Sequence, residues 1–183
     1  MSGHHQDIGG HRARAATSVS SVDGARIAPL AEADWEVFAA LRLRALAEAF
    51  GTTDQQYRQE ERFTAGQWRR RVSEHTQFAV WLADRPVGLI GAYQQSAATV
   101  YLYSLWLDPT VRGRGLAHEL IAAALDWAGT RDARTVYLRV AADNAVARAV
   151  YAGLGFTPVP DADAMAGEMS MARTVGYPDG SGR

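Results

Sequence analysis

The sequence predicts a single domain of mixed α/β (α+β) architecture. A chain of 183 residues, 48% of them hydrophobic, can bury one core. Short β-branched and aromatic runs alternate with longer stretches of helical periodicity. Within residues 99–141, a strand, a helix and a second strand follow one another, and such a unit requires a parallel, right-handed crossover.

One short strand and three helices are expected first. Arg26–Leu30 is an apolar strand, and Asp34–Ala49 repeats apolar residues at helical spacing. Asp54–Arg62 is a shorter, polar helix. The third helix, Thr64–Glu74, begins at a capping box because Gln67 follows its first residue by three positions.

The middle of the chain predicts three successive strands. Gln77–Ala83 and Pro86–Gln94 form a hairpin around the turn Asp84-Arg85. Thr99–Leu107 is rich in aromatic and β-branched residues and is the clearest strand.

The last third predicts a helix over Gly115–Ala128, a strand over Thr135–Ala141 and a helix over Asn144–Leu154. Two short strands, Phe156–Val159 and Gly167–Thr174, complete the sheet. The domain therefore covers residues 25–174. Residues 1–24, which show no periodicity, are expected to form a disordered N-terminal tail, and 175–183 a C-terminal tail.

Composition excludes several classes of function. The 19 basic and 20 acidic residues leave a net charge of −1, which argues against nucleic acid or an anionic membrane as the main partner. Because there is no cysteine, disulfides, zinc–thiolate sites and acyl-cysteine intermediates are excluded. No metal site is expected: the histidines of the tail, His4, His5 and His11, are interpreted as solvated. With no signal-peptide pattern and no apolar run of membrane-spanning length, the expected location is cytoplasmic.

The junction "VRGRG", Val111–Gly115, suggests an anion site. Unpaired N–H groups and a partial positive charge mark a helix N-terminus, and glycines allow a ligand to approach the backbone closely. A phosphate or pyrophosphate fits such a junction best. A Walker loop is excluded because the chain has no lysine, and the dinucleotide fingerprint fails because His118 stands where a small residue is needed. The alternative is an ordinary strand–turn–helix connection.

The sequence at this point resembles the GCN5-related N-acetyltransferase (GNAT) family. Residues Arg112-Gly113-Arg114-Gly115-Leu116-Ala117 match its Gln/Arg-x-x-Gly-x-Gly/Ala signature. The preceding strand "YSLWLDP" and the later block "DNAVARAVYAGLGF" are similar to two further conserved stretches of that family. The resemblance covers residues 25–173 and is sharpest over 101–156.

The resemblance implies a central, mostly antiparallel sheet whose fourth and fifth strands run parallel and splay apart, with helices on both faces. It implies acetyl-CoA as cosubstrate and no metal. The pantetheine arm would pair with backbone groups of Leu105, Trp106 and Leu107, and the pyrophosphate would bind the amides of residues 112–117.

It also implies the chemistry, which is transfer of acetyl from acetyl-CoA to a primary amine by direct attack in a ternary complex. Tyr151 matches the general acid that protonates the leaving thiolate, and the Leu107 N–H is the candidate for polarising the acetyl carbonyl. Asn144 matches a cofactor contact, although it is also placed to cap the following helix.

The sequence departs from part of the family at the general base. Positions where some members carry glutamate hold Tyr101 and Arg139. A water chain, another carboxylate such as Glu48, or the neutral fraction of the amine would have to serve instead. Arg139 would lower the pKa of a nearby amine, unless it is occupied in an ion pair.

The acceptor is left open between a small molecule, a peptide and a protein, and a homodimer is also left open. Acidic residues of the second helix could attract a cationic amine or form a solvated face, and four aromatic residues could line a pocket or pack in the core. The two sets are Asp54, Glu60 and Glu61, and Trp81, Tyr93, Tyr101 and Tyr103. The rival interpretation, motivated by the missing glutamates, is a non-catalytic acyl-CoA-binding sensor or regulatory module.

Overall fold

The computed structural model describes residues 18–19 and 24–175, and in them eight strands form one sheet in the order β1-β2-β3-β4-β5-β6-β8-β7. Every neighbouring pair is antiparallel except β5 and β6, which run parallel. The strands are β1 (Ser18–Val19), β2 (Ala25–Pro29), β3 (Thr76–Leu82), β4 (Arg85–Ser96), β5 (Thr99–Leu107), β6 (Thr135–Ala141), β7 (Thr157–Pro158) and β8 (Glu168–Thr174).

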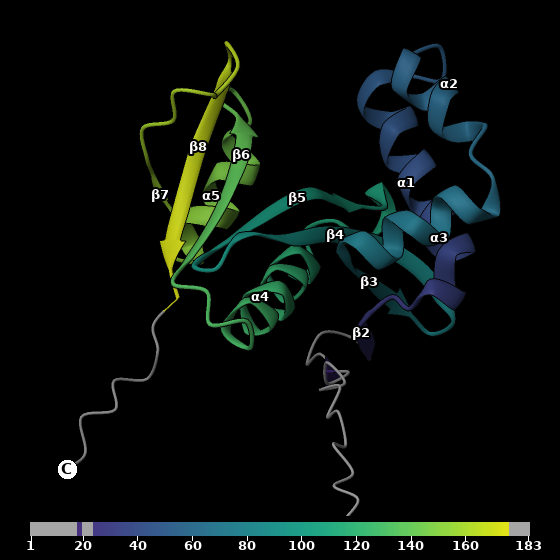
Figure 1. Ribbon diagram of the computed structural model, residues 1–183, viewed down its shortest axis with the longest axis horizontal. Coiled ribbons are helices and arrows are strands. Elements are labelled where there is room, and N and C mark those ends of the chain that lie inside the picture. Colours follow the sequence, from purple (N-terminus) through teal and green to yellow (C-terminus); the bar gives the residue numbers. More distant parts are fainter. Residues whose placement is uncertain (1–17, 20–23, 176–183) are drawn as a thin grey trace, which may run out of the picture.

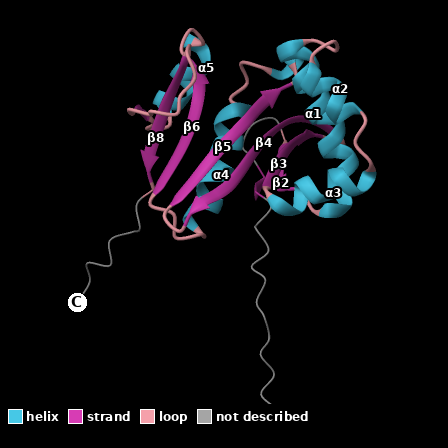
Figure 2. Ribbon diagram, turned by 45° about the horizontal axis from the view of Figure 1, so that its top comes forward, coloured by secondary structure: helices cyan, strands magenta, loops and turns pink. Residues whose placement is uncertain are grey.

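Helices cover both faces of the sheet (Figures 1 and 2). On one face α4 packs against β2 to β5, with α5 beside β6, and on the other α1 and α3 pack against β3, β4 and β5. The mixed fold with a parallel pair between antiparallel strands is thus confirmed. The helices are α1 (Trp35–Phe50), α2 (Gln55–Glu61), α3 (Ala65–Glu74), α4 (Leu116–Gly129) and α5 (Ala145–Gly153), with short 3-10 turns η1 (Glu32–Asp34) and η2 (Pro109–Val111).

The ends of the domain differ from the sequence prediction. Ser18–Val19, assigned to a disordered tail, pairs with β2 as a short strand. Val175, assigned to the C-terminal tail, donates its amide to the carbonyl of Arg134 at 2.9 Å. The rest of the predicted tails, apart from Gly24, lies outside the described residues. A strand of two residues is too short to show the alternating pattern by which a strand is recognised in a sequence.

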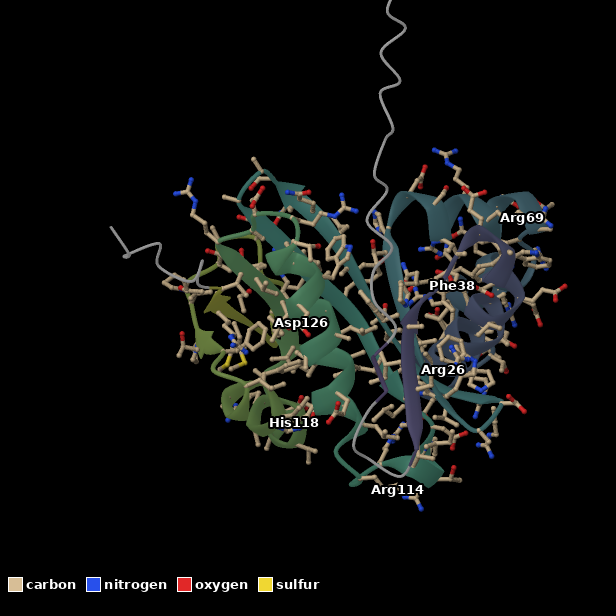
Figure 3. All side chains as sticks on the ribbon, turned by 90° about the horizontal axis from the view of Figure 1, so that it is seen from below. Arg26, Phe38, Arg69, Arg114, His118 and Asp126 are labelled. Carbon is tan, nitrogen blue, oxygen red and sulfur yellow. The ribbon has the colours of Figure 1, made fainter. Side chains whose placement is uncertain are left out.

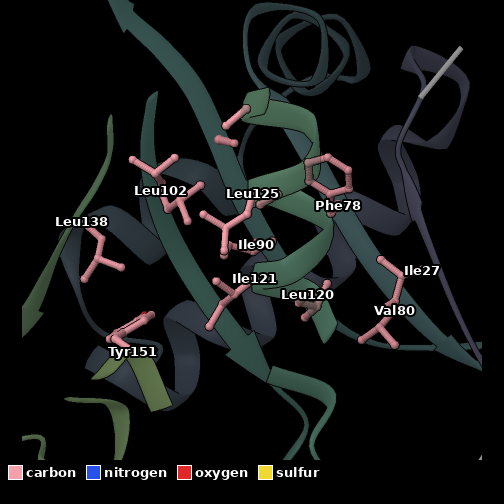
Figure 4. Close-up of a cluster of buried hydrophobic side chains, with 14 of the residues drawn as sticks. Ile27, Phe78, Val80, Ile90, Leu102, Leu120, Ile121, Leu125, Leu138 and Tyr151 are labelled. Atoms are coloured by element: carbon pink, nitrogen blue, oxygen red, sulfur yellow. The ribbon is translucent and has the colours of Figure 1, made fainter. Parts of the chain in front are cut away.

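The core beneath the sheet fixes the position of α4. Leu120 and Ile121 are fully buried against Ile90 of β4 and Leu102 of β5 (Figure 4). Burying side chains of this size stabilises the fold by about 1.5–3 kcal/mol each. The N-terminus of α4 is therefore held on a rigid element beside the end of β5.

A buried ion cluster joins the three helices of the other face to β5. Glu60 of α2, only 3% exposed, accepts two hydrogen bonds from Arg42 of α1, both of 3.0 Å, and pairs with Arg71 of α3 at 2.8 Å. Arg42 also donates to the Ser104 hydroxyl of β5 at 2.8 Å. Burial alone would raise the pKa of Glu60, but the two arginines outweigh it and lower that pKa. Glu60 is therefore neither a solvated surface residue nor an open site for an amine.

Replacing Glu60 with glutamine should lower the free energy of unfolding by about 3 kcal/mol, because the largely buried Arg42 and the partly exposed Arg71 would lose a buried counter-charge. The matched control is Glu74→Gln, whose partner Arg70 is 77% exposed. Such a surface pair contributes about 0–1 kcal/mol. Urea unfolding measures both, and equal losses in the two variants would contradict the prediction.

Candidate active site

The parallel strands β5 and β6 separate partway along their length. They pair from Thr99 with Thr135 to Leu102 with Leu138, and no pairing continues beyond that point in the described chain. Figure 1 shows the two strands diverging from this shared start. Residues 103–107 of β5 consequently present one backbone edge that no described strand covers.

The second half of β5 contains a bulge. Tyr103 pairs with Gly91 of β4 and Trp106 pairs with Leu89, so β5 has one more residue than β4 between these two pairs. Within this stretch Ser104 adopts a positive φ of 53°. A non-glycine residue in this conformation costs on the order of 1 kcal/mol. The hydrogen bond from Arg42 holds the Ser104 side chain at this bend.

The amide of Leu107 faces away from β4. The next amide, Asp108 N–H, donates to the carbonyl of Val87 at 2.8 Å. Since hydrogen-bonded and non-bonded pairs alternate along an antiparallel ladder, the N–H and C=O of Leu107 lie on the opposite edge. Its carbonyl is occupied there by the Arg112 guanidinium, at 3.0 and 2.9 Å.

Arg112 is tied to the end of α1 as well. It donates to Glu48 at 2.5 Å, and Glu48 also accepts from the Trp106 indole at 2.9 Å. The Arg112 hydrogen bond is the main reason that the pKa of Glu48 lies below its usual value, against the opposing effect of burial. Glu48, one candidate for the base, is thus a stabilised carboxylate and a poor proton acceptor.

The loop before α4 contains the two glycines of the predicted anion site. Gly113 and Gly115 take positive φ values of 77° and 82°, and Gly115 is the N-cap residue of α4 without a side-chain hydrogen bond to the helix. The amides of the first turn are therefore not capped by a side chain of residue 115. Figure 3 places Arg114 in this loop and His118 within α4.

Tyr151 projects from α5 into the core on the side of Ile121 and Leu138 (Figure 4). The residue is 8% exposed, and its ring meets that of Phe156 edge-on, with 5.9 Å between the ring centres. Burial, with a smaller effect of Tyr101, raises the pKa of Tyr151 to about 12. Its hydroxyl makes no hydrogen bond within the described residues, so its proton is available to a ligand.

At the start of α5, the Asn144 side chain accepts from the Ala147 amide at 3.0 Å. This contact confirms the capping role. The contact of Asn144 with a cofactor stays a prediction.

An aromatic cluster spans β4, β5 and β6 near the divergence of β5 and β6. The Tyr101 ring lies 5.6 Å from Tyr93, 6.5 Å from Tyr103 and 5.7 Å from Tyr137. His75, at the end of α3, stacks on Tyr93 at 4.7 Å.

Three of the four aromatic residues singled out in the sequence thus meet here. Trp81 does not, because it packs in the separate core under α1 and α3, with Arg26 over its ring. Sequence reasoning missed His75 and Tyr137. One residue in the sequence is related to this cluster: Gly91, a glycine within a strand, leaves room for a neighbouring ring. A Cβ at Gly91 would lie only 2.5 Å from the Tyr103 ring.

Arg139 is occupied by an ion pair. Its guanidinium donates to Asp161 at 2.8 Å, and Asp161 also accepts from Ser170 at 2.6 Å and from Tyr137. These contacts, that of Arg139 first, hold the pKa of Asp161 far below its usual value. The paired Arg139 is therefore a weak means of lowering the pKa of an amine.

The described part of the chain contains no helix long and apolar enough to cross a membrane. It also contains no group of three or more histidine, aspartate or glutamate residues placed to hold a metal ion. A surface hollow lies at α2 and α3, and none of its lining residues belongs to β5, β6, α4 or α5.

Comparison with known proteins agrees with this geometry. The sequence model of the acetyltransferase (GNAT) family matches residues 38–156. A mycothiol acetyltransferase of Beutenbergia cavernae is 48% identical over 63 residues, which are 34% of this chain and 21% of that protein. The matched segment thus spans about a fifth of that curated relative.

Two solved structures share the fold. One is the PaiA N-acetyltransferase of Thermoplasma acidophilum in complex with coenzyme A, with a TM-score of 0.67 at 15% identity over 82% of this chain and 99% of that one. The other is the ribosomal-protein-S18-alanine N-acetyltransferase of Escherichia coli, with a TM-score of 0.63 at 20% identity over 87% and 99%. Because the family model matches well over half of the chain, this protein belongs to the acetyltransferase (GNAT) family.

Proposed function

We propose that this chain is an N-acetyltransferase that moves acetyl from acetyl-CoA to a primary amine by direct attack in a ternary complex. One observation carries the proposal. The fold combines an uncovered edge of β5, a helix N-terminus at Gly115 that no side chain of that residue caps, and a Tyr151 hydroxyl without a hydrogen bond in the described residues. These three features are complementary to an extended amide-containing arm, a pyrophosphate and a leaving thiolate, respectively.

The cofactor roles follow from the backbone. The amides of residues 112–117 would bind the pyrophosphate, helped by the field of α4. Amides of the pantetheine arm would hydrogen-bond to the uncovered edge of β5 as an added strand does. The predicted set was Leu105, Trp106 and Leu107. The Asp108 amide bonds to β4, and residues whose backbone N–H and C=O face β4 alternate along the strand with residues whose groups face away. This alternation favours Leu107, whose backbone groups face away from β4, over Trp106, whose backbone groups face β4. Asn144 lies at the start of α5, the helix that carries Tyr151.

The chemistry needs a polarised thioester, a neutral amine and a protonated leaving group. The Leu107 N–H on the uncovered edge is the candidate donor to the acetyl oxygen, whose negative charge grows as the amine attacks. The C–S bond then breaks, and the thiolate receives a hydrogen bond and finally a proton from Tyr151.

The acceptor remains a primary amine of a small molecule, a peptide or a protein. The relatives named mycothiol acetyltransferases support an amine-acetylating role, but the match spans too little of them to transfer their substrate. The nearest aromatic surface, formed by Tyr93, Tyr101, Tyr103 and Tyr137, supports an acceptor with apolar or cationic groups beside the amine.

Release of free thiol from acetyl-CoA should rise above background hydrolysis when a suitable amine is added. The test incubates the full chain with acetyl-CoA and a panel of amino acids, short peptides, polyamines and amino sugars. Mass spectrometry should find one acetyl group on the amine consumed. Calorimetry with acetyl-CoA alone provides the control for the rival interpretation, because tight binding without transfer to any amine would identify an acyl-CoA sensor instead.

A further inference from the structure

His75 and Tyr103 form a hydrogen-bonded pair on the side of β5 where β4 and β3 lie. The Nδ1 atom of His75 lies 2.7 Å from the Tyr103 hydroxyl, and the Gln77 side-chain amide donates to the same hydroxyl at 2.7 Å. His75 ends α3 just before β3, while Tyr103 precedes the bulge of β5. Gly91 leaves the space in which the Tyr103 ring crosses β4.

The relay requires one particular arrangement of protons, which these contacts allow. The Tyr103 oxygen accepts from Gln77, and this leaves its own O–H able to donate to His75 Nδ1. In that arrangement His75 is neutral, with its proton on Nε2. The Tyr103 oxygen keeps a second lone pair that can accept an N–H proton from a bound molecule.

The charges around His75 are compatible with a neutral ring. Burial is the main cause that lowers the pKa of His75, Arg71 lowers it further, and Glu74 opposes both. Tyr93 of β4 stacks on the ring, and Tyr103 of β5, whose pKa is raised by burial, faces it edge-on. Arg71 is also paired with Glu60.

Tyr101 lies near the pair and has an electrostatic effect on the proposed acid. Its ring lies 6.5 Å from Tyr103, and it contributes, after burial, to the raised pKa of Tyr151. Glu48 and Arg139, the other ionisable groups considered for handling the amine proton, are held by Arg112 and Asp161.

We propose that Tyr103 and His75 act as a proton relay that accepts the proton of the acceptor amine. The inference rests on the proposed function. The amine lone pair forms the C–N bond, and the proton of the broken N–H bond passes to the Tyr103 oxygen. The original Tyr103 proton moves to His75 Nδ1, which gives an imidazolium, and the partly exposed ring then releases a proton to water. Tyr151 protonates the thiolate and regains a proton from water, so the proton lost by the amine is balanced by the proton gained by coenzyme A.

Activity tests the relay with the best amine from the panel. His75→Ala and Tyr103→Phe should each lower kcat about 100-fold, as expected for loss of general base catalysis. Added imidazole should restore part of the activity of His75→Ala. Tyr57→Phe is the control, because Tyr57 lies on α2, away from this cluster, and its hydroxyl makes no hydrogen bond in the described chain.

The pH profile separates catalysis from a structural role. In the wild type, kcat should fall as pH drops through the lowered pKa of His75, below 6.5, since the imidazolium cannot accept a proton. This acidic limb should be absent from His75→Ala. A wild-type rate that follows the pKa of each acceptor amine with no further fall below the pKa of His75 overturns the relay, because it shows that protonation of His75 does not affect the reaction.

Nitrogen-15 NMR of His75 supplies a readout that does not depend on activity. The neutral ring should carry its proton on Nε2, and Tyr103→Phe should change the Nδ1 shift. A neutral ring protonated on Nδ1 overturns the relay. Acetyl transfer with unchanged kcat in His75→Ala overturns the relay alone, whereas absence of transfer to every amine overturns the proposed function and the relay with it.

Discussion

Replacing Tyr151 with phenylalanine should lower kcat about 100-fold, in the range lost when a general acid is removed, while the affinity for acetyl-CoA stays unchanged. The substitution keeps the ring that packs on Phe156 and removes only the hydroxyl. Since that hydroxyl makes no hydrogen bond within the described residues, the fold should lose little stability.

The raised pKa decides how Tyr151 would act. With a pKa of about 12 it stays protonated throughout the neutral range, so the donor is present in every molecule. A thiol near pKa 8.5 is the stronger acid, and full proton transfer to its thiolate would be uphill by about 5 kcal/mol at about 1.4 kcal/mol per pH unit. Tyr151 is therefore expected to share a strong hydrogen bond with the developing thiolate and to complete the transfer late.

Two measurements check this role. Steady-state kinetics should show the loss in kcat for Tyr151→Phe and no loss for Tyr57→Phe, a control on α2 whose hydroxyl also lacks a hydrogen bond in the described chain. Because the pKa of Tyr151 is raised, wild-type activity should not decline through its ionisation until pH approaches 12. If kcat of Tyr151→Phe stays within a factor of about two, well short of the range for general acid catalysis, Tyr151 is a packing residue.

Local patterns were enough to predict the elements that form the site. The hairpin of β3 and β4 and the helices α1 and α3 are specified by periodicity and turn or cap residues within a few positions of one another. The crossover through α4 then requires β5 and β6 to be parallel, as observed.

Contacts between distant residues could not be predicted in the same way. In the sequence, Glu60 is indistinguishable from the other charged residues of a polar helix. Its contact with Arg42, 18 positions away, is formed only in the folded chain. The pairing of His75 with Tyr103, 28 positions apart, depends on the antiparallel register of β3, β4 and β5. Asp161 lies in the segment between β7 and β8, which has no periodicity, so its pairing with Arg139 left no trace in the sequence.

Replacing Gly115 with aspartate should raise the Kd for acetyl-CoA at least tenfold, about 1.4 kcal/mol of binding free energy. Gly115 caps α4 with a φ of 82°, and a carboxylate there would face the phosphates proposed to bind the first-turn amides. Stability should change little. Strain at positive φ costs about 1 kcal/mol, while an acidic group at a helix N-terminus returns about 0.3–1 kcal/mol.

Gly115→Ala separates charge from backbone strain, because alanine meets the same restriction at positive φ and carries no charge. Calorimetry should show a much smaller loss of acetyl-CoA affinity for alanine than for aspartate. The difference between the two variants should shrink as salt is raised, since exposed charges are screened within about 10 Å at 0.1 M ionic strength and within less at higher salt. Equal losses at every salt concentration would assign the effect to loop conformation. Undiminished affinity in a folded Gly115→Asp protein would place the pyrophosphate elsewhere, because a carboxylate cannot share the N-terminus of α4 with a phosphate at no cost.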